Sequence, residues 1–318
     1  MRKALFIILL VSILFISGCG KTTDIADGPF TGGTNGVAIS FADGSPISEF
    51  ASNREVPVKV VLTNNGEYEI PPNSVKIALY GLAMNDYGLS SDYVTLSQSL
   101  LGLKKGLIEE GAQASADMGT LKYQRDLGNV QFIEPTLRAR VCYPYKTEAS
   151  VSACISSREI EESGGESVCT VGSDRIGYSD DEKSPGSTRV SSSPIQVTGF
   201  SEELEGIDKV KFKVDVENKG LGEVYMNDMD CAQIDDPIIK LEKKDMIYFS
   251  ISPLDVKCFS YDGVESNQGY LKLNTGKKSL ICTMPVEVAG SSYLREITIF
   301  LDYKYTESTS KQLKILKA

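Results

Sequence analysis

The stretch VKVVLTNNG, residues 58–66, decides the fold. Its apolar residues Val58, Val60 and Leu62 recur with period two, which places one face of a strand in a core and the other toward solvent, as in an antiparallel sheet. Asn64 and Gly66 then supply turn chemistry, because Gly accepts positive φ and Asn tolerates it. The stretch predicts a β-strand followed by a chain reversal.

The same alternation surrounds it. Residues 37–41 and 75–79 each place apolar side chains at every second position, and turn residues separate them. Residues 84–127 are the least regular part of this half. Several leucines there fit one side of a helix, but Gly106 and Gly111 interrupt the pattern, so we expect short strands and loops.

The second half of the chain repeats the first. Residues 58–66 match residues 212–220, both with the pattern apolar-x-apolar-x-apolar-x-Asn-x-Gly. Upstream, residues 37–40 match residues 195–198, and downstream Tyr143-x-Tyr145 matches Tyr303-x-Tyr305. Three marks in the same order predict two copies of one β-domain.

This pattern resembles the immunoglobulin-like β-sandwich modules called CARDB or NEW3, which occur in tandem on archaeal and bacterial surface proteins. The resemblance rests on residues 58–66, residues 212–220 and the closing Tyr-rich strand, and it covers about two thirds of the chain. It implies an all-β chain of two tandem immunoglobulin-like antiparallel sandwiches, at residues 36–157 and 193–318. Such modules usually mediate adhesion or act as spacers, and they share no catalytic residues that could be carried over.

The N-terminus predicts export. Arg2 and Lys3 precede a mostly apolar run at residues 4–16, which ends in Ser17-Gly18-Cys19. A charged start, a short apolar run and small residues form a secretory signal, and the run is short for a spanning helix, which needs about 20 residues. Residues 16–19 resemble a lipobox. By that resemblance residues 1–18 are a signal peptide, Cys19 carries lipid, and an uncleaved signal anchor is the alternative.

Two segments of low complexity divide the exported part. Residues 19–35 are rich in Gly, Thr and Asp and predict a flexible tether. Residues 158–192 are rich in Ser and Gly and predict a linker between the domains. Without Arg2 and Lys3 the mature net charge is 31 − 43 = −12. An acidic surface repels phosphate backbones, so we expect no nucleic acid partner.

The cysteine count fits an exported protein. Of seven cysteines, six remain if Cys19 is lipidated, and an even number outside the cytosol predicts three disulfides among fifteen pairings. A hairpin turn near residues 146–148 would pair Cys142 with Cys154, and adjacent strands would pair Cys258 with Cys282. Cys169 and Cys231 would then pair with each other. Cys154 with Cys169 is the competing pairing.

Catalytic patterns are scarce. The chain has no His, so Ser-His-Asp, Cys-His and His-based zinc sites are excluded. Ser308 and Lys311 have the Ser-x-x-Lys spacing, but the companion motifs are missing. A carboxylate pair for glycoside hydrolysis is a tertiary arrangement, and nothing in the sequence selects one. We expect no cofactor and no enzyme activity.

Two further groups have both a functional and a structural interpretation. An acidic loop offers calcium ligands, but it lacks the Gly and the terminal Glu of an EF-hand, and a solvated loop is the simpler interpretation. The calcium candidates are Asp228, Asp230, Asp235 and Asp236. Tyrosines of the duplicated motif would stack on sugars if exposed, but aromatic residues in strands more often pack.

These observations predict an extracytoplasmic, lipid-anchored binding or structural module. Its partners would be the membrane, through Cys19, and a surface protein or glycan. A solute-binding or transport accessory protein is the first alternative and would need a cleft between domains. A carbohydrate-active enzyme using carboxylates alone is the second and would need a pocket with two facing acids.

Overall fold

The computed structural model describes residues 28–108, 110–157, 168–169, 171–172, 176–177, 187–286 and 292–318. The described part is all-β apart from one short α-helix, α3 (Pro237–Lys243), and two 3-10 turns, η1 (Met84–Tyr87) and η2 (Cys231–Gln233). None of its helices has the length and apolar character needed to cross a membrane. The signal segment and Cys19 lie outside the described residues.

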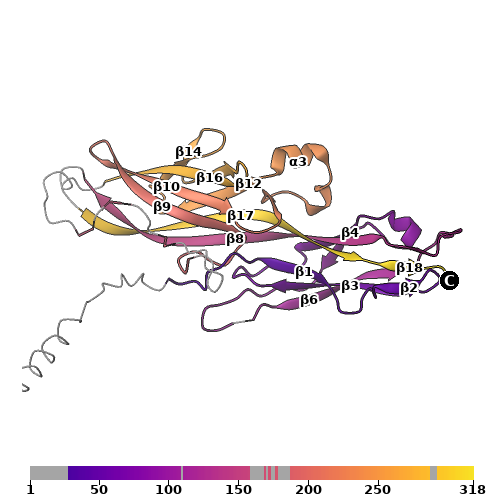
Figure 1. Cartoon of the computed structure of the whole chain (residues 1–318). Coiled ribbons are helices and arrows are strands. Elements are labelled where there is room, and N and C mark those ends of the chain that lie inside the picture. Colours follow the sequence, from indigo (N-terminus) through magenta and orange to yellow (C-terminus); the bar gives the residue numbers. More distant parts are fainter. Residues whose placement is uncertain are drawn as a thin grey trace, which may run out of the picture.

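Two long strands form the axis of the molecule (Figure 1). β8 (Thr136–Ser156) and β17 (Ser292–Gln312) are each 21 residues long and pair antiparallel over their whole length. In their register Tyr143 faces Tyr305, Pro144 faces Lys304, and Tyr145 faces Tyr303. The duplicated Tyr motifs therefore cross at the centre of the pair, and a pseudo-twofold axis passes between Pro144 and Lys304.

The two halves repeat one strand order around this axis. In the first half the order is β1-β3-β6, and in the second the corresponding strands follow the order β9-β10-β16 within a five-stranded sheet that continues through β13 to β14. The first-half strands are β1 (Val37–Phe41), β2 (Glu49–Ala51), β3 (Val56–Asn64), β4 (Val75–Tyr80), β5 (Val94–Leu96), β6 (Gln113–Leu121) and β7 (Phe132–Ile133).

The second-half strands continue the numbering. They are β9 (Ile195–Glu205), β10 (Lys209–Asn218), β11 (Glu223–Met226), β12 (Met246–Ser252), β13 (Lys257–Phe259), β14 (Glu265–Ser266), β15 (Gln268–Lys272), β16 (Lys277–Pro285) and β18 (Lys314–Leu316). The central sheet has the order β15-β12-β17-β8-β4-β5, with β11 also paired to β17. β18 returns to the first half and pairs with β2 and β7.

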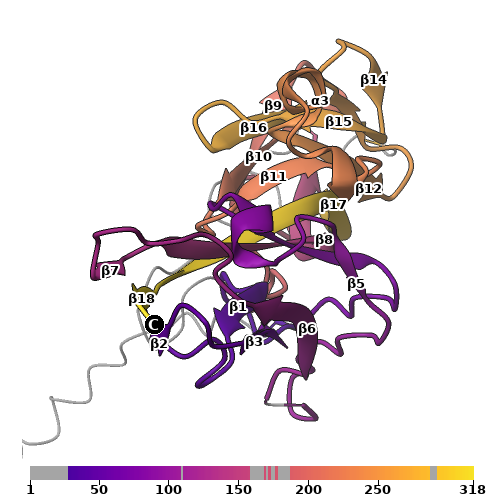
Figure 2. The same cartoon turned by 90° about the vertical axis from the view of Figure 1, so that its right-hand side faces the viewer.

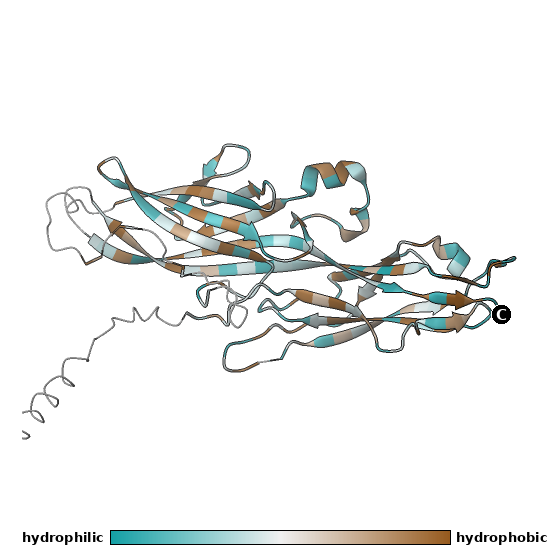
Figure 3. Cartoon of the chain, in the orientation of Figure 1, coloured by the Kyte–Doolittle hydropathy of each residue, from teal (hydrophilic) through white to brown (hydrophobic). Residues whose placement is uncertain are grey.

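One hydrophobic core runs through both halves. The outer sheets lie against the central one, and in Figure 2 the two halves stand on either side of the β8–β17 pair. Figure 3 shows the predicted alternation of apolar and polar residues along the strands. A single cluster of buried apolar residues extends from Val37 to Ile315 and includes the four duplicated tyrosines.

The duplication itself is confirmed, down to its hydrogen bonds. Tyr145 Oη donates to Asn64 Oδ1 (3.3 Å), and Tyr305 Oη donates to Asn218 Oδ1 (2.9 Å). Each Asn also accepts the amide N–H of the Gly two residues on, at 3.2 Å. The equivalent tyrosines Tyr143 and Tyr303 accept the amides of Val37 (3.1 Å) and Ile195 (3.4 Å).

The role of the duplicated glycines differs from the prediction. Neither Gly66 nor Gly220 has a positive φ. A Cβ at Gly66 would lie 1.8 Å from Tyr145 Oη, and a Cβ at Gly220 would lie 2.3 Å from Tyr305 Oη. Glycine is needed here because a tyrosine hydroxyl approaches the backbone closely, not because the chain turns through a left-handed conformation.

The two expected units are joined through a shared sheet. Residues 146–148 lie in the middle of β8 and form no turn. Because β8 pairs with β17 from end to end, the units at residues 36–157 and 193–318 share one sheet. The all-β class with antiparallel sheets is confirmed, whereas the two tandem immunoglobulin-like sandwiches are not confirmed. For residues 84–127, the expected strands and loops are confirmed by β5 and β6, and η1 adds one 3-10 turn that was not predicted.

Parts of the expected tether and linker are packed. At residues 28–35, the amides of Thr31 and Gly32 donate to the Glu67 carboxylate, and Phe30 N donates to Thr188 O. At the other segment, Ser191 and Ser192 are buried at the waist, the region around Thr147 and Ser193 where the two halves meet. Of the expected linker, residues 168–169, 171–172, 176–177 and 187–192 are described, and of the expected tether residues 28–35; the remainder of both segments lies outside the described residues.

Candidate functional site

All six cysteines of the described residues form disulfides: Cys142–Cys231, Cys154–Cys169 and Cys258–Cys282. The Cys258–Cys282 pairing is the predicted one, and these residues lie opposite each other on β13 and β16. The Cys142–Cys154 pairing is wrong. Both residues lie on β8, twelve positions apart, and at about 3.3 Å per residue they are roughly 40 Å from each other.

The remaining pairings follow from this correction. Cys154 instead bonds Cys169, the competing pairing, and so ties the predicted linker to β8. The Cys169–Cys231 pairing is also wrong, because Cys231 bonds Cys142 across 89 residues of sequence. Three disulfides indicate an oxidising, extracellular type of environment, since such bonds rarely persist in a reducing cytosol.

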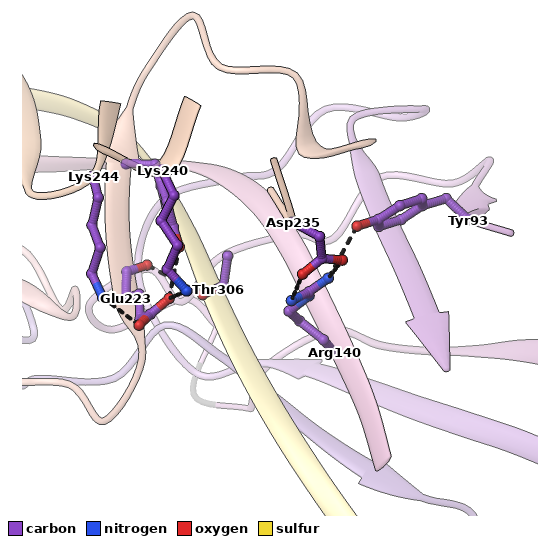
Figure 4. A network of polar contacts seen from close by, with 8 residues as sticks. Tyr93, Arg140, Glu223, Asp235, Lys240, Lys244 and Thr306 are labelled. Carbon is purple, nitrogen blue, oxygen red and sulfur yellow. Dashed lines mark hydrogen bonds and ion pairs between the residues drawn. The ribbon is translucent and has the colours of Figure 1, made fainter. Parts of the chain in front are cut away.

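The acidic loop, residues 228–236, holds the second half against the first (Figure 4). Arg140 on β8 donates two hydrogen bonds to the Asp235 carboxylate, at 2.9 and 2.6 Å, and a third to Tyr93 Oη at 3.2 Å. Partial burial works against the charge on Arg140, yet its hydrogen bonds with Asp235 raise the pKa of the guanidinium. The Cys142–Cys231 disulfide joins the same loop to β8, two residues further along the strand than Arg140.

The other calcium candidates are also engaged. Asp230 pairs with Lys76 (2.7 Å) and Asp228 with Lys243 (2.9 Å), while Asp236 accepts the Ile238 amide at the start of α3 (2.8 Å). In the described part of the chain no three carboxylate, Cys or His side chains converge as metal ligands. Cations of the protein itself hold the loop, which therefore has a structural role in joining the two halves.

A second ion cluster lies beside the first in Figure 4. Glu223 on β11 accepts hydrogen bonds from Lys244 and Tyr225, and Lys240 lies 3.8 Å away. Burial alone would raise the pKa of Glu223, but these hydrogen bonds lower it below its ordinary value. The carboxylate is thus stabilised as an anion and anchors the end of α3 to β11.

The duplicated tyrosines are core residues. Tyr143, Tyr145, Tyr303 and Tyr305 are at most 2% exposed. Burial raises the pKa of every one of them, so each phenol stays neutral as a hydrogen-bond donor or acceptor. Packing, not sugar stacking, is their role. Ser308 and Lys311 are three positions apart on β17, so they face opposite sides of the strand.

One cavity holds two carboxylates. It has a volume of about 350 Å³ at the waist and is lined by Glu67, Glu148, Lys146 and the loop lysines Lys104 and Lys105. Burial raises the pKa of Glu148, with a further contribution from the charge on Glu67 and an opposing one from Lys146. Glu67 itself accepts backbone amides of Thr31, Gly32 and Ser192, which occupy both of its oxygens.

A larger groove of about 490 Å³ lies on the second half. The Cys258–Cys282 disulfide points into the core and fixes β13 beside β16, which turns Phe259 and Ile281 outward. Phe259 is 51% exposed and Tyr261 is 62% exposed. Lys272 Nζ lies 5.4 Å from the centroid of the Tyr261 ring.

The groove has an apolar floor and polar walls. Leu271 and Leu273 are buried beneath it, and Asn274 and Ser279 border it. It continues into a second depression of about 380 Å³, which shares the wall residues Lys278 and Ser279 and also carries Thr198 and Asp215. Ser279 Oγ donates to Asp215 Oδ1 at 2.6 Å. Sequence reasoning missed this surface, although two aromatic residues two positions apart in a turn-rich stretch were a visible signal.

Comparisons with known proteins add little. No family model matches the chain, so the resemblance to CARDB and NEW3 modules stays a prediction. No curated protein matches it either. Among solved structures, it aligns with the C-terminal globular domain of an oligosaccharyltransferase from Pyrococcus abyssi, at 7% identity and a TM-score of 0.22. That alignment covers 89% of this chain and 50% of the other, and at this TM-score it carries no functional argument.

Proposed function

We propose that the chain is a membrane-tethered, extracytoplasmic binding module that binds a glycan in the groove beside Phe259 and Tyr261. The exposed aromatic pair carries the proposal. Two large apolar rings left half-exposed or more beside an apolar floor are unusual on a protein surface unless they contact a ligand. Their rings match the apolar faces of sugar rings.

The polar walls support a sugar rather than a lipid or an apolar peptide. Asn274, Ser279 and Thr198 offer uncharged hydrogen-bonding groups, and Lys272 and Lys278 offer donors. Sugar hydroxyls need such mixed partners. The shared wall of the two depressions gives an extended surface, which fits several sugar units in a row better than a single one.

The test is binding to polysaccharides by affinity electrophoresis, with the whole exported chain. Tyr261→Ala and Phe259→Ala should each abolish retardation by the glycan that retards the parent protein. Phe132→Ala is the matched control, because Phe132 is 44% exposed and Lys314 Nζ lies 5.3 Å from its ring centroid, far along the sequence from the groove. Equal loss in all three variants, or none, would argue against the groove.

The tether is the other half of the proposal, and it rests on the sequence of residues 1–19. Cys19→Ala should release the protein from the membrane fraction or stall its processing. Unchanged mass and membrane retention in that variant would favour an uncleaved anchor instead.

A carbohydrate-active enzyme is the second candidate, favoured by the cavity that holds Glu67 and Glu148. Glu148, with its raised pKa, would be the acid. Glu67 is poorly suited as its partner, because backbone amides already hold both of its oxygens. Hydrolysis of a glycan that Glu148→Gln abolishes, with binding retained, would favour this candidate. A hinged solute-binding protein fits less well, since β8 and β17 join the halves along one sheet.

A further inference from the structure

We propose that the loop LGLKKGLI, residues 101–108, docks on the lipid surface and inserts leucine side chains at its boundary. The inference rests on the proposed membrane tether and adds to it a second contact that orients the molecule. Leu107 is 82% exposed and Leu101 is 45% exposed, and they flank Lys104 and Lys105. Exposed apolar side chains with adjacent lysines are typical of segments that lie in a membrane interface.

The loop is built to present these leucines. Lys104 and Ile108 exchange backbone hydrogen bonds at 3.0 and 2.8 Å, which close a tight turn with Gly106 at φ 70°. At its base Leu103 N donates to Gly66 O at 2.8 Å, and a Cβ at Gly102 would lie 2.3 Å from Glu67 O. The base is packed against the waist, so Leu107 projects from a fixed support.

The position of the loop brings it to the membrane. Lys105 Nζ donates to Gly28 O at 2.7 Å, so the loop lies beside the first described residue of the chain. Cys19 precedes Gly28 by 28 − 19 = 9 residues, and nine residues span at most about 30 Å even when extended. A lipid on Cys19 would therefore hold this loop near the bilayer, at a high effective concentration.

The chemistry of the loop fits a lipid surface rather than a protein partner. Leucine side chains enter the boundary between headgroups and acyl chains, while the ammonium group of Lys104 reaches lipid phosphates and Lys105 stays on Gly28. Glu110 follows the loop and the mature chain is acidic, so the attraction rests on the leucines more than on net charge. We therefore expect docking on phosphatidylcholine, without a requirement for anionic lipid.

The experiment uses the fact that the chain contains no Trp. The lipidated full chain with Leu107→Trp is reconstituted in phosphatidylcholine vesicles, and its emission is compared with that in vesicles of brominated phosphatidylcholine. Leu241→Trp is the matched control, because Leu241 is 78% exposed. Its helix α3 lies on the side of the molecule opposite β6, the strand that follows the loop, in both Figure 1 and Figure 2.

The expected result is a blue-shifted emission at position 107 that brominated lipid quenches, with neither effect at position 241. Equal emission and no quenching at both positions, in protein that sediments with the vesicles, would overturn docking while leaving the tether intact. Equal quenching at both positions would overturn it too, because the contact would not be specific to the loop. Failure to sediment would overturn the tether and, with it, this inference.

Discussion

Tyr145 on β8 and Tyr303 on β17 occupy opposite positions in the central strand pair, with ring centroids 6.3 Å apart. They are not equivalent residues: Tyr145 is the second tyrosine of the first motif, and Tyr303 is the first tyrosine of the second motif. The repeats therefore meet through the same motif that defines each of them. The two tyrosines of each motif cover the Asn-x-Gly stretch of their own half and pack against the tyrosines of the other half. Neither core is therefore complete alone.

The buried asparagines should differ in their contribution to stability. Asn64 is fully buried and donates to Tyr68 O and Leu100 O, whereas Asn218 is partly exposed and donates to Gly222 O. We expect Asn64→Ala to cost about 2–3 kcal/mol and Asn218→Ala about 1–2 kcal/mol, since each buried partner left unpaired adds to the loss. Urea unfolding measures both. A larger loss at Asn218 would contradict the prediction.

The two halves should unfold together. The β8–β17 pair joins them over 21 residues, and one apolar cluster spans both. Far-ultraviolet circular dichroism and tyrosine fluorescence should therefore give one coincident urea transition. Two separated transitions, or a stable fragment ending before residue 193, would show that the halves are independent.

Removal of each disulfide should cost stability in the order of its loop length. The bridges close 89, 24 and 15 residues, which the chain-entropy model converts to roughly 4–5, 3.5 and 3 kcal/mol. Paired Ala variants of Cys142 and Cys231 should therefore lose the most. Before the variants are compared, non-reducing peptide mapping of the parent protein should recover the Cys142–Cys231 peptide. The greatest loss at Cys154 and Cys169 would reverse the order.

Glu307→Gln should stabilise the protein at neutral pH only. Burial raises the pKa of Glu307. A carboxyl with a raised folded-state pKa is penalised above that pKa and carries no penalty below its unfolded value of about 4.3. We expect a gain of a few tenths of a kcal/mol near pH 7, because solvent screens a half-exposed group, and none near pH 3. Urea unfolding at the two pH values measures it.

Asp235→Asn is the control of opposite sign. The hydrogen bond with Arg140 lowers the pKa of Asp235, so its stabilisation is present above the unfolded pKa and is lost as pH falls through the folded one. This variant should lose stability near pH 7, and the loss should shrink in acid. A pH-independent effect in both variants would show that packing, not charge, is responsible.

The strands and the duplication were predictable because period-two alternation is a local property. The pairing of β8 with β17 was not. Lys146 and Glu148 resemble turn residues, and nothing local shows that Lys146 lies 3.1 Å from Asp302, across the sheet and 156 residues away in sequence. One misplaced turn then misassigned two disulfides, since the hairpin argument placed Cys142 opposite Cys154.

The candidate sites show the same limit. The acidic loop was a calcium candidate because its carboxylates are close in sequence, but two of the cations that neutralise it, Lys76 and Arg140, come from the first half. The groove was missed because the exposure of Phe259 depends on the register of β13 against β16. Both depend on contacts between distant segments.

The length of β8 has a consequence for synthesis. Its partner strand begins 292 − 136 = 156 residues later, so at about 5–20 residues per second the ribosome needs roughly 8–30 seconds to supply it. During that interval one edge of β8 has no partner strand. Unpaired strand edges promote association between nascent chains. The last strands to emerge, β17 and β18, complete the first half. A chain that ends before residue 292 would therefore leave that edge of β8 exposed permanently and be prone to aggregate.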